Sequence, residues 1–316
     1  MAFPDFPLAH KIAVITGAGS GINLAFARLC IQHNAKVLIA DLKLTSEAST
    51  FLSTLDSKTA VFVKCDVAKR CDLENLVTVS EKEWGDVPDV WVAGAGVFEP
   101  SWSNFWDDTE EDDYAQVAIN VNHPIKLARI AIRALLRKGK KGVFLITASI
   151  AGFAGNFSAP LYCATKHAIV GFVRSMKDFD EVGGVKFVAI APGYVFTPPP
   201  SSPCQHFLAD AGSRVVRTPL WTDYPEKMKQ FGYMLENSIT PEKVSQDMAE
   251  LVTEGKYGGG TCLETSATGT RVLGTWNIEP PSWAGKVLPK EVLDNFRAPI
   301  MEHVRRERAG GDKKEI

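Results

Sequence analysis

Residues 12–23 read IAVITGAGSGIN, and this stretch decides the fold. A short run of β-prone residues, 12–16, leads into glycines at positions 17, 19 and 21, where helical spacing of apolar residues begins. A strand, a glycine-rich turn and a helix make an anion site, because bare N–H groups and the helix dipole face the anion. A glycine turn alone can also be an ordinary connection, so the prediction depends on the rest of the chain.

The same alternation continues along the chain. Apolar, β-rich runs at 36–40, 60–64, 87–93, 142–148, 185–191 and 261–265 are separated by segments with helical spacing at 21–33, 46–55, 73–83, 113–138, 161–179 and 241–254. Such alternation indicates βαβ units, and apolar runs of this kind fit strands that are buried on both faces. We therefore predict an α/β protein: a single-domain, Rossmann-type doubly wound parallel sheet with helices on both faces and a substrate lid.

The length of 316 residues suggests two domains at about 150 residues each. The alternation nevertheless runs through both halves without a Pro/Gly/Ser-rich linker, so we predict one domain over residues 1–316, with a core at about 8–275. Residues 197–223 begin with TPPPSSP and show little periodicity, which predicts a lid at about 198–224 over one sheet edge. The tail, 305–316, is expected to be frayed and solvated.

The composition argues against several classes of protein. Lys plus Arg total 35 and Asp plus Glu total 37, and the net charge of −2 argues against nucleic-acid binding, which normally needs a basic excess. Six cysteines without a C-x-x-C pair argue against a metal site and for reduced thiols in the cytoplasm. The first residues lack the features of a signal peptide and no apolar run reaches about 18 residues, so no membrane segment is expected.

Two aspartates follow the next two strands. Asp41 ends the second strand, 20 residues after Gly21, where a carboxylate can accept both hydroxyls of an adenosine ribose and repel a 2′-phosphate. Asp41 could instead be a helix cap or a loop residue, and the glycine turn before it favours the ribose. Asp66 follows the third strand and would lie near the adenine. The series predicts NAD as the cofactor.

A second group of polar residues follows the run at 142–148. Ser149 ends this strand, Tyr162 lies 13 residues later, and Lys166 lies four residues after Tyr162. Positions i and i+4 share one helix face, so the Lys166 ammonium lies beside the Tyr162 phenol and favours the phenolate. The pair would act as a general acid/base near neutral pH. A lone Tyr-x-x-x-Lys pair is usually a surface feature, but Ser149, the glycine turn and Asp41 together favour catalysis.

These motifs resemble those of the short-chain dehydrogenase/reductase family, and the resemblance covers about residues 8–275. The segments that carry it are TGAGSGI at 16–22, AGAG at 93–96, Asn120, Ser149, Tyr162 with Lys166, and PGYVFT at 192–197. Asp41 together with the stretch 233–270 looks most like the NAD-dependent 15-hydroxyprostaglandin dehydrogenase branch.

The resemblance implies four catalytic residues. Tyr162 would be the acid/base, and Lys166 would bind the nicotinamide ribose and lower the pKa of the phenol. Ser149 would hold the substrate oxygen, and Asn120 would anchor a proton-relay water, with Asn122 as a local rival. The residues expected to bind NAD, with Thr197 bonding the carboxamide, are Gly17, Gly19, Ser20, Gly21, Ile22, Asp41, Leu42, Cys65, Asp66, Val67, Ala93, Gly94, Tyr162, Lys166, Pro192, Val195 and Thr197.

Two positions depart from the family pattern. Asn23 stands where the family has its third glycine, which permits close packing of helix on strand. The first helix is therefore expected to lie slightly away, or the turn to differ. Ala93-Gly94 replaces the first two residues of the usual Asn-Asn-Ala-Gly segment and loses two side-chain amides. Both changes predict weaker NAD binding without touching the acid/base.

Aromatic residues near the carboxyl ends of the strands predict a pocket for a bulky lipophilic substrate, since ligands bind there in open α/β sheets. The substrate residues expected are Phe153, Tyr194, Phe196, Phe207 and Trp221. These side chains could instead pack the lid onto the sheet. The histidines beside the motifs, His123 and His167, are expected to be structural or exposed, and no metal site is proposed.

The sequence thus predicts an NAD-dependent oxidoreductase that interconverts a secondary alcohol and a ketone. The alternatives are a biosynthetic enzyme of the same fold that carries out reduction, cyclisation or isomerisation, and an NAD-binding regulator without catalysis. In the resembled family the helices equivalent to 113–138 and 161–179 pair across a two-fold axis, which favours a homodimer or homotetramer. Apolar residues beyond the needs of one sheet face support this pairing, namely Leu127, Ile130, Ile132, Leu135 and Leu136.

Overall fold

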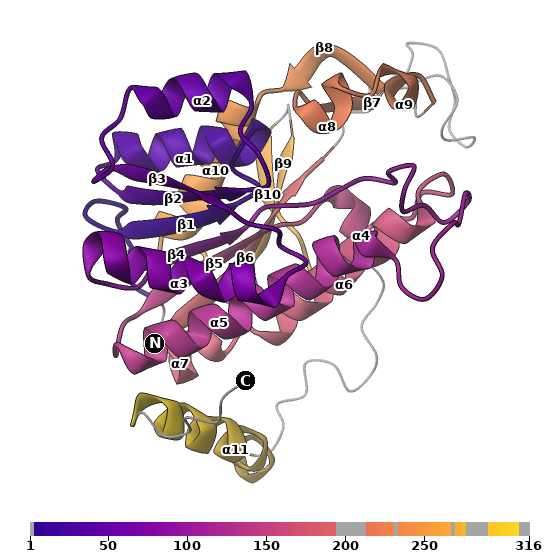
Figure 1. Ribbon diagram of the computed structural model, residues 1–316. Helices are drawn as coiled ribbons and strands as arrows, with labels where there is room; N and C mark the ends of the chain where they lie inside the picture. Colours follow the sequence, from indigo (N-terminus) through magenta and orange to yellow (C-terminus); the bar gives the residue numbers. More distant parts are fainter. Residues whose placement is uncertain (1–2, 194–212, 231–232, 267–268, 276–289, 310–316) are drawn as a thin grey trace.

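The computed structural model describes residues 3–193, 213–230, 233–266, 269–275 and 290–309 (Figure 1). Within these ranges an eight-stranded sheet has the order β10-β9-β6-β5-β4-β1-β2-β3, and only the β9–β10 pair is antiparallel. The strands are β1 (Ile12–Thr16), β2 (Lys36–Asp41), β3 (Ala60–Lys64), β4 (Val90–Ala93), β5 (Gly142–Thr147), β6 (Val185–Pro192), β9 (Cys262–Ser266) and β10 (Gly269–Val272). The predicted doubly wound parallel sheet is confirmed.

Helices cover both faces of the sheet (Figure 1). Apolar residues of α3 (Arg70–Trp84), α5 (His123–Arg137) and α6 (Pro160–Ser175) share one core cluster with the sheet. Residues of α1 (Gly21–Gln32) and α10 (Pro241–Thr253) share a second cluster on the other face, and Leu52 of α2 (Ser46–Ser53) packs against it. Because the strands are apolar on both faces, each face contributes to one of the two cores.

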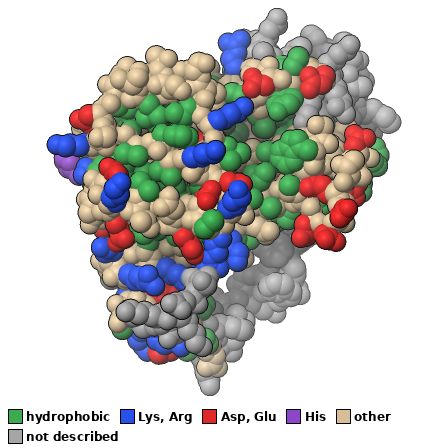
Figure 2. All heavy atoms as spheres, viewed as in Figure 1, with side chains coloured by type: hydrophobic (Ala, Val, Ile, Leu, Met, Phe, Trp, Pro, Cys, Tyr) green, Lys and Arg blue, Asp and Glu red, His purple; other side chains and the backbone are tan. Residues whose placement is uncertain are grey.

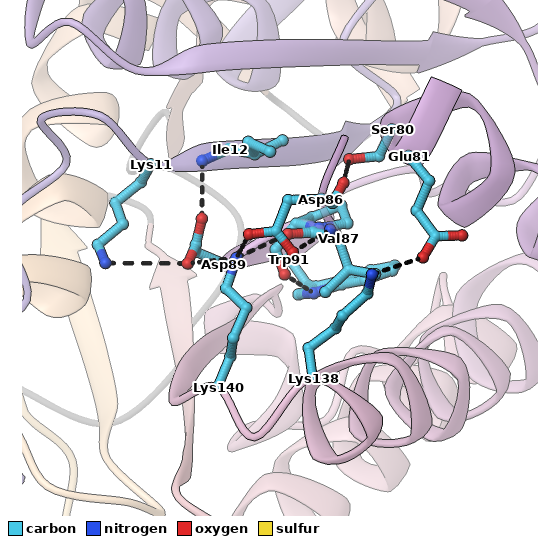
Figure 3. A network of polar contacts seen from close by, with 11 residues as sticks. Lys11, Ile12, Ser80, Glu81, Asp86, Val87, Asp89, Trp91, Lys138 and Lys140 are labelled. Carbon is cyan, nitrogen blue, oxygen red and sulfur yellow. Dashed lines mark hydrogen bonds and ion pairs between the residues drawn. The ribbon is translucent and has the colours of Figure 1, made fainter. Parts of the chain in front are cut away.

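The amino ends of the central strands are joined by a buried carboxylate (Figure 3). Asp89 lies just before β4, and its Oδ2 accepts the Ile12 N–H of β1 at 3.0 Å. Lys140, just before β5, places its Nζ 3.0 Å from Asp89 Oδ1, and Lys11 lies 3.8 Å from the same oxygen. A buried charge needs such partners. This network fixes β1, β4 and β5 relative to one another at the edge opposite the glycine turn.

The predicted long helices are interrupted. The segment expected at 113–138 begins with α4 (Ala115–Val117), continues through a π-helical turn, η1 (Ala118–Asn122), and becomes α5. The segment expected at 161–179 ends as α6 at Ser175 and is followed by α7 (Phe179–Val182). The periodicity of apolar residues persists across such interruptions, which is why the sequence does not reveal them.

The region expected as a structureless lid contains regular elements in its described part. Of residues 198–224, those from 213 on are described, and they form β7 (Ser213–Val216) and α8 (Pro219–Thr222). β7 pairs in parallel with β8 (Tyr233–Ile239), and α9 (Pro225–Gln230) lies between them in sequence. A separate two-stranded sheet therefore rises beside the carboxyl edge of the main sheet (Figure 1).

The chain does not fray at residue 305 as expected. Residues 305–308 continue α11 (Lys290–Arg308), which lies along α5 (Figure 1). Val304 is buried against the core, and Glu307 forms ion pairs with both Arg129 and Arg133 of α5. One buried apolar side chain and one shared carboxylate anchor the helix.

The apolar residues that suggested helix pairing are already covered within one chain. Their side chains are all less than a tenth exposed, at Leu127, Ile130, Ile132, Leu135 and Leu136. They belong to the core cluster that α5 shares with the sheet, α3, α6 and Val304 of α11. The excess of apolar residues therefore reflects burial within one chain. These five residues do not support assembly, which stays a prediction from the family resemblance.

The surface in Figure 2 carries lysine, arginine, aspartate and glutamate side chains interspersed, without one basic stripe. None of the helices in the described part of the chain is both long enough and apolar enough to cross a membrane. Within the described residues, no three histidine, cysteine, aspartate or glutamate side chains cluster as a metal site requires.

Candidate functional site

One cleft runs along the carboxyl ends of the strands, from Asp41 at one end to Tyr162 and Trp221 at the other. Ligands bind at this edge in open α/β sheets. Predicted cofactor residues that line the cleft are Gly17, Ser20, Gly21, Ile22, Asp41, Leu42, Cys65, Asp66, Val67, Gly94, Tyr162, Lys166 and Pro192. Gly19 and Ala93 lie behind it, and Val195 and Thr197 fall outside the described residues.

The glycine turn is shaped by close backbone approach. Gly17 has φ +70°, and a Cβ on it would lie 2.7 Å from the Ala95 backbone. Gly21 has φ +58°, and a Cβ there would lie 3.1 Å from Thr218 Cγ2. Both positions therefore require glycine, for conformation and for space. The second contact also shows that the start of α8 lies against the turn, which the sequence did not predict.

Asp41 lies beside the same turn. Its Oδ2 accepts the Gly19 N–H at 2.8 Å, and the backbone N–H of Lys43 lies 3.4 Å from Oδ1. The carboxylate thus orients the glycine backbone while facing the cleft. Farther along, the Cys65 thiol is held protonated: burial, and then the charge of Asp72, raise its pKa to about 12. This end of the cleft fits an adenosine, with one carboxylate for the ribose hydroxyls.

Asn23, in the first turn of α1, is held by hydrogen bonds to the neighbouring backbone. Its side chain is buried and its Nδ2 donates to Gly94 O at 3.0 Å and to Gly17 O at 3.4 Å. Its Oδ1 lies 3.5 Å from Thr147 Oγ1 at the end of β5. The amide therefore joins the glycine turn to the ends of two further strands.

A buried histidine, His123, contacts Thr16 at the start of the glycine turn. His123 Nε2 lies 3.1 Å from Thr16 Oγ1, and its Nδ1 lies 3.2 Å from Ile119 O. Burial lowers the pKa of His123 to about 4, so the ring is neutral and can donate only from one nitrogen. Thr16 Oγ1 also accepts the Gly94 N–H at 3.0 Å. His123 is structural, as expected, and it braces the residue that holds Gly94.

Tyr162 and Lys166 lie side by side at the far end of the cleft. Lys166 Nζ is 5.5 Å from the centre of the Tyr162 ring and donates to Thr147 O at 2.7 Å. Burial lowers the pKa of Lys166 to about 8. Ser149 lines the same part of the cleft and accepts the Ala151 N–H through its Oγ at 3.2 Å. The structure brings the three predicted residues together.

Asn120 is the buried member of the asparagine pair, whereas Asn122 is exposed. Asn120 Oδ1 accepts the Val97 N–H at 2.9 Å, and its Nδ2 donates to Val97 O at 2.9 Å and to Thr165 Oγ1 at 3.2 Å. Both amide hydrogens are engaged with the protein. In this arrangement the side chain ties the loop after β4 to α6, next to Lys166.

The substrate end is aromatic, but not with all the predicted residues. Trp221 lines the cleft and packs on Phe98 with ring centres 4.6 Å apart, and Phe98 packs edge-on against Tyr162 at 4.7 Å. Phe153 does not line the cleft, because its ring lies under the Arg174 guanidinium and against the core. Tyr194, Phe196 and Phe207 lie outside the described residues.

Sequence reasoning missed several lining residues. They include Val216, Thr218 and Pro219. The pair Thr218-Pro219 is a typical start of a helix, with proline in the first turn, and could have indicated α8. Nothing local in the sequence places these residues over the glycine turn.

The fold and the cleft define a dinucleotide-binding α/β protein, and comparisons with known proteins specify the family. A family model for the short chain dehydrogenases matches residues 11–202. Short-chain dehydrogenase reductase 3a of Arabidopsis thaliana is 34% identical over 190 residues, covering 60% of this chain and 73% of that protein. Galactitol 2-dehydrogenase of Agrobacterium fabrum is 32% identical over 189 residues, covering 60% and 72%. The chain belongs to the short-chain dehydrogenase/reductase family.

A solved structure agrees in fold. The 3-ketoacyl-(acyl-carrier-protein) reductase of Brucella melitensis, complexed with NADH, superposes with a TM-score of 0.64 at 22% identity. The match covers 82% of this chain and 98% of that chain. This likeness confirms the Rossmann-type α/β fold of the chain.

Proposed function

We propose that the protein transfers a hydride between NAD(H) and a bulky lipophilic secondary alcohol or ketone. The observation that carries this proposal is the pairing of Tyr162 with Lys166 beside Ser149 in one cleft that begins at Asp41. The cleft offers glycine backbone for phosphates, a carboxylate for a ribose and a lysine for a second ribose. A nicotinamide bound there would accept or supply the hydride.

The side chains of the protein would handle the proton. Tyr162 would take the proton from the carbinol oxygen during oxidation and return it during reduction. The buried Lys166, held by Thr147 O, keeps a positive charge near the phenol and stabilises the phenolate. Ser149 would hold the substrate oxygen by a hydrogen bond. Asn120, which lies next to Lys166, would anchor a proton-relay water.

The substrate class follows from the aromatic end of the cleft. Phe98, Trp221 and Leu220 offer apolar surface, and α8 partly covers it. Burial of a lipophilic group there would exclude water from the reacting centre. We propose that the predicted lid at 198–224, which includes Phe207, also contributes apolar surface to the substrate pocket. We propose the same for Tyr194 and Phe196.

The test is a screen of lipophilic secondary alcohols and ketones that follows NADH absorbance. Tyr162→Phe removes the transferable proton but keeps the ring, so turnover should fall by about 10²–10⁴-fold. NADH binding should survive in this variant. Lys166→Ala should lower turnover and also weaken NADH binding. Near-full turnover by Tyr162→Phe contradicts the proposal. NADH binding without turnover of any substrate would favour a regulator.

Assembly, location and subfamily stay predictions. We propose a homodimer or homotetramer of one-domain chains in the cytoplasm, and membership of the 15-hydroxyprostaglandin dehydrogenase branch. Exposed positions that could take part in such pairing are Ile125 on α5 and Ala164, Ala168 and Gly171 on α6. Light scattering that gives 34.5 kDa at micromolar concentration would contradict the dimer.

A further inference from the structure

Two neighbouring residues contact Tyr162 at two different places. The Phe98 ring packs edge-on against the Tyr162 ring at 4.7 Å. The carboxylate of the next residue, Glu99, accepts the Tyr162 backbone N–H at 2.8 Å. In extended chain, consecutive side chains point to opposite sides, so both would not reach one residue.

The backbone at Glu99 departs from extended conformation. Glu99 has φ +35°, in the left-handed region that favours glycine. Such a conformation persists only where the surroundings impose it, and residues of this kind cluster at functional sites. Here the Glu99 N–H donates to Gln116 Oε1 at 2.7 Å, and Gln116 is fully buried on α4. The strained backbone is thus held by a buried amide.

The helix that carries Tyr162 lacks a cap of its own. The residue before α6 is Ala159, whose side chain cannot accept a hydrogen bond, and the first helical residue is Pro160. The first N–H groups of a helix need partners from outside the helix. Glu99, which is only 3% exposed, provides one of them at Tyr162. A negative charge at this end of a helix is also favourable.

We propose that Glu99 is a positioning residue for Tyr162: its carboxylate caps α6 from a distant loop and thereby fixes the phenol beside Lys166. Lys166 is anchored separately, by its bond to Thr147 O on β5. Loosening of the first turn of α6 would therefore move Tyr162 relative to Lys166. The proposal rests on the proposed acid/base role of Tyr162.

Two variants separate position from charge. Glu99→Gln removes the negative charge but keeps an acceptor oxygen and the same backbone strain. Glu99→Gly also removes the charge, takes away the acceptor, and relaxes the left-handed backbone. The two variants differ in the acceptor and in the backbone strain at position 99, so the loss of the cap is measured at residues 160–166, away from the strained position. Because glycine suits this backbone, Glu99→Gly should fold, and NADH binding checks that it does.

The first measurement is amide hydrogen exchange over residues 160–166 in the full chain. Exchange in Glu99→Gly should be roughly threefold to thirtyfold faster than in Glu99→Gln, the range expected for a lost cap. Exchange over α1 should be the same in both variants.

The second measurement is the ultraviolet titration of the Tyr162 phenol, taken as a difference from the same variants carrying Tyr162→Phe. The Lys166 ammonium lies over the Tyr162 ring, and the Glu99 carboxylate contacts the Tyr162 backbone N–H. In Glu99→Gly the midpoint should lie about half a pH unit or more above that in Glu99→Gln, because the phenol is farther from Lys166.

Coincident midpoints in the two variants would overturn the proposal, even if exchange differs, because the cap would then be only structural. Equal exchange rates would overturn it as well. Neither measurement needs a substrate, so the inference about Glu99 can fail while Tyr162→Phe turnover still supports the proposed function. If instead Tyr162→Phe keeps its turnover while the exchange rates and midpoints differ as expected, the proposed function fails and the contact of Glu99 with α6 stands.

Discussion

Asn23 and Gly94 share one volume between α1 and β4. Asn23 Nδ2 donates to Gly94 O at 3.0 Å, and a Cβ added to Gly94 would overlap the Asn23 amide. The family has glycine at the position of Asn23 and asparagine at the position of Gly94. In this chain the amide therefore comes from α1 and the glycine stands after β4. Asn23 thus supplies an amide in place of the one that the family carries at the position of Gly94.

The exchange predicts strong coupling between the two positions. Gly94→Asn alone should destabilise the protein by about 1–3 kcal/mol through overpacking and weaken NADH binding. The double variant Asn23→Gly/Gly94→Asn should recover much of this loss, a coupling of about 0.5–3 kcal/mol. Urea unfolding and NADH titration of the single and double variants measure it, with Asn23→Ala as control. Additive effects of the two changes would contradict the shared volume.

Asp41 predicts a preference for NADH over NADPH. Its carboxylate faces the cleft beside Gly19 and would repel a 2′-phosphate. Asp41→Asn keeps an oxygen for the Gly19 N–H but removes the charge, so the ratio of the two dissociation constants should shift toward NADPH by about tenfold. Fluorescence titrations with both cofactors test this. Lys43→Ala should shift the ratio the other way, toward NADH, because Lys43 is exposed and close enough in sequence to soften the discrimination. Equal or tighter NADPH binding by the unaltered protein refutes the prediction.

His123 predicts a loss of stability in acid. Burial lowers the pKa of His123 to about 4, below the usual value near 6.5. Between these values the unfolded chain binds the proton more readily, so the stability is present above about pH 6.5 and lost as the pH falls toward 4. The free energy of unfolding should drop by roughly 3 kcal/mol over this window from this group.

Urea unfolding at several pH values checks the histidine prediction. His123→Leu should show a shallower fall between pH 6.5 and 4 than the unaltered protein, although its stability at pH 7 is lower. His167→Gln should leave the slope unchanged, since His167 is exposed. Parallel pH profiles for His123→Leu and the unaltered protein would show that another group controls acid unfolding.

Phe98 and Trp221 predict selectivity for bulky substrates. Their rings lie 4.6 Å apart and line the cleft next to Tyr162. Phe98→Ala and Trp221→Ala should each lower kcat/KM for bulky substrates by about 10–200-fold, while small alcohols lose much less. Phe157→Ala is a suitable control, since Phe157 is 83% exposed. Equal kcat/KM values for small and bulky substrates, unchanged by both variants, would rule out the lipophilic pocket.

Local patterns in the sequence are sufficient for the parallel strands of the main sheet, though not for β10, and for the pairing of Tyr162 with Lys166. Strand and helix periods are read within a few residues, and a glycine turn between them marks the cofactor edge. The spacing of four residues places Tyr162 and Lys166 on one helix face without knowledge of the fold. The strand–turn–helix unit at 12–32 and the Tyr162/Lys166 pair depend only on residues that are close in sequence. The structure has both at the predicted positions.

Tertiary structure alone decided which distant residues meet. Glu99 reaches Tyr162 across 63 positions and Asn23 reaches Gly94 across 71, and no local period connects either pair. Phe153 was predicted for the pocket, but its ring turns to the core beneath Arg174, because its direction depends on how the loop after β5 packs. Such contacts depend on the packing of whole elements against one another, and this packing is a property of the complete chain.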